Sequence, residues 1–122
     1  MGYEISIDKV VEGFKVLAGE DNATDGYIFC RTAAGTVNSW LDSRKELSKY
    51  GEEISYAAAT IAYYRFILKN SGDNDTIKAG DITVTDNSEK SVAFAEKLMN
   101  DAIKSIEPYL QSKRFAFIGT EV

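Results

Sequence analysis

Few side chains in this sequence are of the types that carry out chemistry. The chain has 122 residues, no histidine and a single cysteine, Cys30. Histidine is the commonest general base near neutral pH and the commonest metal ligand. Without it no Ser-His-Asp or Cys-His arrangement can form, and a thiol at Cys30 lacks a base to activate it. Cys30 is therefore better explained as a small core residue.

Carboxylates are the remaining candidates for chemistry. Residues 21–26 resemble the start of a calcium loop, but Ala23 and Thr32 stand where an oxygen ligand and a bidentate glutamate are required. Asp81, next to Gly80, is the carboxylate to test first for a catalytic role, although a turn residue is the simpler interpretation. The glycines are scattered and form no phosphate-binding loop. We therefore expect no catalytic site, no cofactor and no metal, and a protein that is not an enzyme.

The composition limits the classes of partner that the protein is expected to bind. A net charge of −5 and a sequence pI of about 4.7 argue against a nucleic-acid binder. Basic faces supply most of the non-specific affinity for phosphates, so no specific nucleic-acid binding is expected. No apolar run is long enough to span a membrane, and the charged N-terminus does not resemble a secretion signal, which predicts a cytosolic protein. The length predicts a single helical domain over residues 1–122.

Apolar residues at helical spacing indicate the elements that must position any site. The pattern predicts a bundle of about four helices. Residues 52–70 combine a wide apolar stripe with several alanines, which would let other helices approach closely, so we expect the central helix there. The others are expected over residues 5–18, 25–41 and 86–106. Gly35 is expected to permit close packing of its helix, and a kink there is the alternative that stays open.

Residues that favour helix ends support these bounds. Ser6 suits the N-cap of the first helix, and Gly19 suits the left-handed position that ends it. Pro108 is expected to stop the last long helix just before it.

The pattern changes between residues 76 and 86, where apolar and polar residues alternate around Gly80 and Asp81. Such alternation is typical of a small hairpin or of two extended arms. An unpaired strand edge would be a natural place for another subunit to bind. The alternating apolar residues are Ile77, Ala79, Ile82 and Val84.

Alternation recurs near the C-terminus, at Phe115 and Phe117, and predicts a strand-like tail. The predicted fold class is therefore mainly α. It consists of a helical bundle, a short β segment or hairpin inserted before the last long helix, and this tail.

The flank of the central helix carries Tyr63, Tyr64 and Arg65. Aromatic residues and arginine are enriched at protein interfaces, which favours a binding surface. The alternative, which stays open, is that the tyrosines line the rim of the core with their hydroxyls reaching water.

The order of these features is similar to that of a known family. Residues 57–65 read AAATIAYYR, residues 77–85 read IKAGDITVT, an amphipathic helix follows, and residues 115–117 read Phe-Ala-Phe. This order resembles the head–tail connector proteins of tailed bacteriophages and prophages, also called head-completion or adaptor proteins. The resemblance extends over residues 50–118 and includes no catalytic signature.

The resemblance implies a structural subunit that forms a homo-oligomeric ring at the phage neck, between the portal protein and other neck or tail proteins. It also implies the bacterial host cytoplasm, with incorporation into the virion. Ring formation needs two different complementary faces on each subunit. The candidate interface residues are Tyr63, Tyr64, Arg65, Ile77, Asp81, Ile82, Val84, Phe115 and Phe117.

Two other classes of function stay open. One is another non-enzymatic binding module, such as a tail-completion protein or an acidic inhibitor or adaptor of a basic host protein. Loss of binding to a non-phage partner on substitution of Tyr63 or Arg65 would favour it. The other is a cryptic enzyme or ligand-binding helical domain, which stabilisation by metals or metabolites would reveal.

Overall fold

The computed structural model describes residues 3–77 and 82–111, and for residues 71–77 and 82–90 it describes the backbone alone. The described chain is a helical bundle. Its helices are α1 (Ile7–Ala18), α2 (Ala23–Trp40), α3 (Gly51–Ile77) and α4 (Ile82–Ser105). Single 3-10 turns lie at Glu20–Asn22, Ser48–Tyr50 and Glu107–Tyr109.

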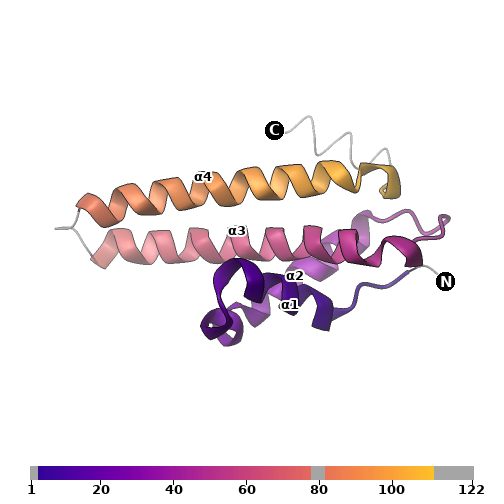
Figure 1. The fold of residues 1–122 in the computed structure, drawn as a ribbon, viewed down its shortest axis with the longest axis horizontal. Coiled ribbons are helices and arrows are strands. Elements are labelled where there is room, and N and C mark those ends of the chain that lie inside the picture. The colour runs from indigo at the N-terminus through magenta and orange to yellow at the C-terminus, as the bar shows by residue number, and fades with distance from the viewer. Residues whose placement is uncertain (1–2, 78–81, 112–122) are drawn as a thin grey trace.

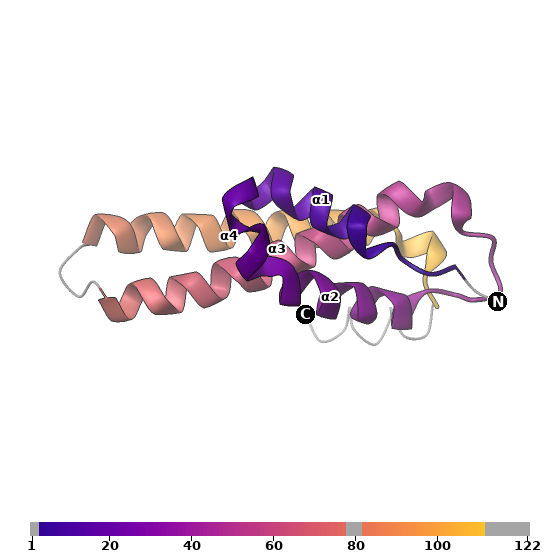
Figure 2. The same cartoon turned by 90° about the horizontal axis from the view of Figure 1, so that it is seen from below.

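Helix α3 is the centre of the bundle. It contacts α1, α2 and α4, which confirms the predicted central helix. α4 runs antiparallel along one side of α3, and α1 and α2 cover the opposite side (Figure 1). The α3–α4 pair extends beyond α1 and α2 at the end where α3 finishes and α4 begins (Figure 2).

Burial on α3 explains this arrangement. From Ile54 to Ala62 every side chain except that of Tyr56 is buried, so the helix is covered nearly all round. Ala57, Ala58, Ala59 and Ala62 are small enough for three neighbours to approach the α3 backbone together. Larger side chains from the neighbours fill the remaining space, because protein interiors are close-packed.

Three phenylalanines bring α1, α2 and α3 together where the alanines end. The Phe14 and Phe66 rings meet edge to face with centroids 5.3 Å apart. The Phe29 ring approaches Phe66 in the same way at 6.3 Å. Such pairs add about 0.5–1.5 kcal/mol each beyond the burial of their surface.

Two glycines set how closely the helices pack. A Cβ atom on Gly26 of α2 would lie 2.2 Å from Cζ of Phe14, so the Phe14 ring occupies the space of a missing side chain. A Cβ atom on Gly13 of α1 would lie 2.8 Å from Cβ of Ala59. The prediction for Gly35 was wrong, because nothing lies within 4 Å of a Cβ atom placed there.

The residues at the helix ends behave only in part as their types predict. Ser6 is the N-cap residue of α1, but its side chain makes no capping hydrogen bond. Gly19 ends α1 with a φ of 99°, a backbone conformation that L side chains rarely adopt. Helix α4 ends at Ser105, and Pro108 lies in the 3-10 turn that follows.

The predicted β segment is wrong wherever the structure describes it. α3 continues to Ile77, and α4 begins at Ile82 and includes Val84, so these residues are helical. Asp81 lies outside the described residues. A two-stranded hairpin is marginal without a further strand or an apolar partner, whereas a helix satisfies its own backbone groups. β-branched residues cost only a few tenths of a kcal/mol each in a helix, which is too little to interrupt two long packed helices.

After α4 the chain turns back to the end of α2. Leu110 forms an isolated antiparallel bridge with Leu41. The Asp42 amide donates to the Tyr109 carbonyl at 3.0 Å, and the Gln111 amide donates to the Trp40 carbonyl at 2.8 Å. This C-terminal bridge fixes the last described residues, whereas the predicted strand-like tail with Phe115 and Phe117 lies outside the described residues.

The side chain of Asp42 orders the loop that begins beside the C-terminal bridge. Its carboxylate is 7% exposed and accepts from Nε and Nη2 of Arg44 at 3.0 and 3.1 Å, and from the Arg44 amide at 3.0 Å. The side-chain hydrogen bond from Arg44, followed by the one from its amide, holds the pKa of Asp42 below the ordinary value of 3.8.

We predict that Asp42→Asn lowers the free energy of unfolding at pH 7. Because the pKa of Asp42 is lower in the folded than in the unfolded state, its contribution is present above the unfolded pKa and is lost as the pH falls through the folded pKa. The loss caused by Asp42→Asn should therefore shrink below about pH 4. Urea unfolding from pH 3 to pH 7 measures the difference in free energy of unfolding between the variant and the unsubstituted protein. Asp101→Asn, which removes an exposed carboxylate 3.5 Å from Lys97, is the control and should change little.

A second prediction compares two glycines of the same helix. Gly26→Ala should lower the free energy of unfolding by about 1–3 kcal/mol, because the new methyl group overlaps the Phe14 ring. Gly35→Ala should raise it by about 0.5–1 kcal/mol, because alanine favours helix and meets no neighbour there. Chemical denaturation of both variants measures the difference. Equal effects would contradict the described packing of α1 on α2.

Candidate functional site

The predicted flank of the central helix does not form one surface. Tyr63, Tyr64 and Arg65 are consecutive in α3, so their side chains point in successive directions around the helix. Each is half-buried. Tyr63 packs against the core, and Nη1 of Arg65 donates to Oγ1 of Thr32 on α2 at 3.4 Å. The interface role of these residues stays a prediction, and the core-rim interpretation fits Tyr63.

The other predicted interface residues are less well defined. Ile77 ends α3, and Ile82 and Val84 lie in the first turn of α4, so they share the end of the bundle that extends beyond α1 and α2. Asp81, Phe115 and Phe117 lie outside the described residues.

Cys30 is buried between the helices, as the sequence predicted. Burial raises the pKa of its thiol to about 11, because the thiolate would lose its hydration there. The group is therefore a protonated core residue and not a nucleophile.

Neither a metal centre nor a membrane span is found in the described part of the chain. No group of three or more histidine, cysteine, aspartate or glutamate side chains there could hold a metal ion. Among the described helices, none has a stretch long and apolar enough to cross a bilayer.

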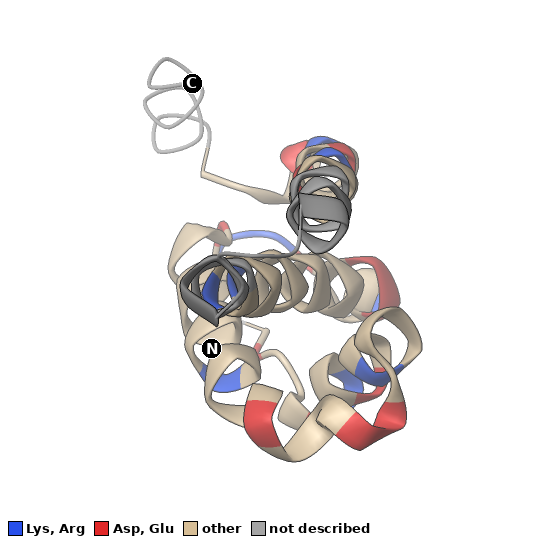
Figure 3. Cartoon of the chain, turned by 90° about the vertical axis from the view of Figure 1, so that its left-hand side faces the viewer, with Lys and Arg blue, Asp and Glu red and all other residues tan. Residues whose placement is uncertain are grey.

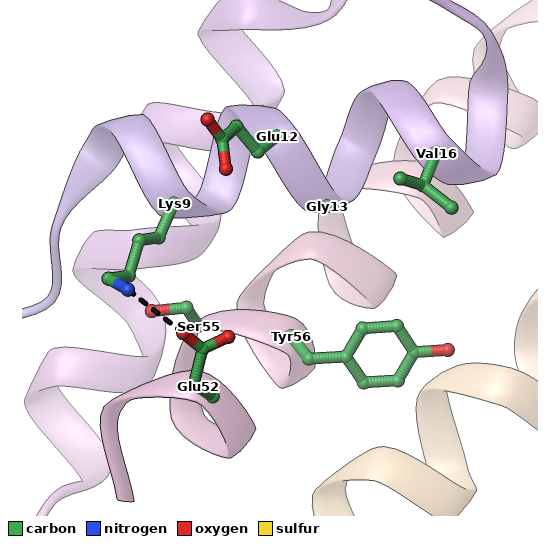
Figure 4. A pocket seen from close by; sticks show the side chains of 7 residues that line it. All are labelled: Lys9, Glu12, Gly13, Val16, Glu52, Ser55 and Tyr56. Carbon is green, nitrogen blue, oxygen red and sulfur yellow. Dashed lines mark hydrogen bonds and ion pairs between the residues drawn. The ribbon is translucent and has the colours of Figure 1, made fainter. Parts of the chain in front are cut away.

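A hollow lies between α1 and α3 in the described part of the chain. Its volume is about 230 Å³. α1 contributes residues one turn apart, and α3 contributes residues from a single face (Figure 4). We call it the α1–α3 groove, and it is lined by Lys9, Glu12, Gly13, Val16, Glu52, Ser55 and Tyr56.

An ion pair spans the groove. Nζ of Lys9 donates to Oε2 of Glu52 at 3.0 Å, with the two side chains 50% and 87% exposed (Figure 4). This hydrogen bond and the charge of Glu52 raise the pKa of Lys9. Exposed pairs of this kind stabilise a fold little, so the pair mainly fixes where the two charges lie.

Ser55 gives the groove an unsatisfied polar group. Its side chain is on the buried face of α3, with 3% of the residue exposed, and its hydroxyl has no hydrogen-bond partner in the described chain. Such a hydroxyl costs about 1–3 kcal/mol relative to a satisfied one. Thr60, also buried on α3, differs because its hydroxyl donates to the Ala57 carbonyl at 2.7 Å.

Apolar surface completes the groove. Val16 is 83% exposed and Tyr56 is 42% exposed, and both line the hollow. Single exposed apolar residues are common on protein surfaces. Here two of them flank a polar group that lacks a partner, which is a combination suited to binding a peptide segment.

The groove also holds a serine and a lysine, the residue types of a Ser–Lys nucleophile pair. For catalysis Lys9 would have to be a neutral base. Its pairing with Glu52 instead raises its pKa and keeps it an ammonium, so it cannot take a proton from Ser55 near neutral pH. The geometry favours binding over nucleophilic chemistry.

Sequence reasoning did not find this groove. Its α1 side lies outside the apolar face that places Val10 and Phe14 in the core. The one available signal was Val16, an apolar residue off that face and one turn after Glu12. The α3 side could not be inferred, because which helix packs against residues 52–56 depends on the tertiary arrangement.

Comparisons of this chain with protein-family models, with curated proteins and with solved structures found no match.

We predict that Ser55→Ala leaves the free energy of unfolding unchanged or raises it by up to about 1 kcal/mol, because it removes a buried hydroxyl that has no partner. Thr60→Val is the matched control. It removes a hydroxyl that does have a partner, and it should lower stability by about 1 kcal/mol. Thermal and urea unfolding measure both. A loss at Ser55→Ala as large as that at Thr60→Val would show that the Ser55 hydroxyl is satisfied in the isolated protein.

Proposed function

We propose that the protein is a non-enzymatic structural subunit of the neck of a tailed phage or prophage. In this proposal it is a head–tail connector that assembles into a ring between the portal protein and the tail components. The observation that carries the proposal is the sequence order at residues 57–65, 77–85 and 115–117, which resembles that family. The helical bundle is compatible with it.

The rigid core supports a structural role. α3 is packed on three sides by helices, and its Ala-rich stretch leaves little room for movement between them. A subunit that transmits contacts between two larger assemblies needs such a body, because loosely packed helices would change their relative positions under load.

Exposed apolar side chains on different flanks supply a second argument. Tyr27 and Ile28 are consecutive on α2 and are 46% and 55% exposed, while Val16 and Tyr56 line the α1–α3 groove. α1 and α2 lie along different flanks of α3 in Figure 2. A heterologous ring contact needs two different surfaces on one subunit, and these flanks are the candidates.

The charge of the protein fits a passage for DNA. The net charge is −5, and Figure 3 shows that acidic residues are spread around the bundle. A negative surface does not bind phosphates, so a ring of such subunits would let DNA pass without retaining it.

The same acidity favours a second candidate function. A protein with this charge could bind a basic partner as a tail-completion protein, or as an acidic inhibitor or adaptor. Electrostatic attraction would then steer the encounter, and binding would weaken strongly as the salt concentration rises.

Co-expression with the portal protein of the same phage or prophage tests the proposal. We expect the two to co-purify and to form rings visible by cryo-electron microscopy. Arg65→Ala should reduce assembly, because Arg65 contacts Thr32, one turn after the exposed Ile28 on the α2 flank. Lys97→Ala, which removes an exposed cation on α4 that pairs only with Asp101 in the described chain, is the control. Failure of the portal to retain the protein, together with salt-sensitive binding to a basic host protein, would favour the second candidate instead.

A further inference from the structure

We propose that the α1–α3 groove is the docking site for residues 113–118 of a second copy of this chain. This inference deepens the proposed function, because it names the contact between neighbouring subunits of the ring. It joins two features: a groove with excess negative charge and exposed apolar side chains, and a basic and aromatic segment that follows a fixed end of the chain.

The position of the chain end favours a second copy over the same chain. Gln111 is fixed at the end of α2, where its amide donates to the Trp40 carbonyl and its Nε2 donates to the Leu41 carbonyl at 3.0 Å. The segment therefore starts on the α2 flank, whereas the groove lies between α1 and α3. The docked segment ends at residue 118, so at roughly 3.3 Å per residue it reaches at most about 23 Å from Gln111.

The charges of the two surfaces are complementary. The groove has two carboxylates, on Glu12 and Glu52, and one ammonium, on Lys9. Glu52 is paired with Lys9, and Glu12 has no ion-pair partner in the part of the chain that is described. Lys113 and Arg114 begin the C-terminal segment, so an incoming copy would bring a cation to Glu12. Such pairs set register and orientation more than affinity.

The apolar surfaces also match. Phe115, Phe117 and Ile118 follow the basic pair in sequence. Val16 and Tyr56 offer exposed apolar surface beside the hollow, and an aromatic ring placed against them would be removed from water. Aromatic residues are frequent anchors of protein interfaces.

The size of the hollow favours one or two side chains over a whole cofactor. Its volume is about 230 Å³. Pockets for small ligands usually measure roughly 300–1,000 Å³.

Site-specific disulfide formation in full-length chains tests the docking. One copy carries Val16→Cys and the other carries Phe117→Cys, and the two are mixed in equal amounts with the portal protein and oxidised mildly. We expect a disulfide-linked dimer of the two different chains. Phe94→Cys replaces Val16→Cys in the control, since Phe94 is 58% exposed on α4 and does not line the groove. The unmodified chain, with only the buried Cys30, controls for its own thiol.

Charge exchange tests the register. Glu12→Lys on the Val16→Cys chain, or Arg114→Glu on the Phe117→Cys chain, should each reduce the yield of linked dimer several-fold. The two changes together should restore it, because the opposite charges face each other again. A double change that is no better than the singles would overturn the proposed pairing of Glu12 with the basic start of the segment.

The outcomes separate this inference from the proposed function. Rings that form on the portal without linked dimers would overturn the docking and leave the connector function standing. Linked dimers without rings would support the docking and contradict the connector function. A chain carrying both cysteines that links only to itself would show that the segment occupies its own groove and would overturn the proposal. Absence of both rings and links would contradict both.

Discussion

The close approach of helices to the Ala-rich part of α3 is the constraint on which the rest of the structure depends. Residues 57–62 are buried on every side, which is only feasible because most of their side chains are methyl groups. Gly13 and Gly26 extend the same constraint to α1 and α2, since neither position has room for a Cβ atom beside its neighbour. Alanine contributes little apolar surface, so the larger burial comes from side chains around it, chiefly Phe14 and Phe66.

The α1–α3 groove is a product of this packing. Gly13 brings α1 close to Ala59, so the longer side chains before and after it spread apart along the contact. Ser55 is buried on α3 beside Ile54, and its hydroxyl has no hydrogen-bond partner in the described chain. A binding surface of this kind needs no dedicated loop, since two helices that pack tightly at one point leave a hollow next to it.

Sequence patterns were sufficient for the helical body and insufficient for its contacts. The alanines and the spacing of Ile54, Ala58 and Ile61 predicted the central helix, because a long periodic stretch has few alternative structures. The alternation around Ile82 and Val84 led to a wrong prediction, since a short run of β-branched residues fits either a strand or a packed helix, and residues 3–77 and 82–111 contain no further strand for it to pair with. The local sequence pattern could not distinguish a strand from a helix here, because the choice depends on which other elements pack against the segment.

Glycines show the same limit in one helix. Gly26 and Gly35 both lie in α2, and the sequence predicted close packing for Gly35 and not for Gly26. Only the reach of the Phe14 ring from α1 distinguishes them. The groove is a similar case: Lys9 and Glu52 are far apart in sequence, and their ion pair depends on the angle at which α1 crosses α3.

The C-terminal bridge has a mechanical consequence. Because Leu110 is joined to Leu41 through backbone hydrogen bonds on either side, tension applied at the end of the chain acts first on the junction of α2 and α3. Those bonds and the stacked Tyr50 and Tyr109 rings, 4.4 Å apart, must give way before α4 can be peeled from its neighbour. A pull from outside therefore meets the contacts at the end of α2 before it can unravel α4.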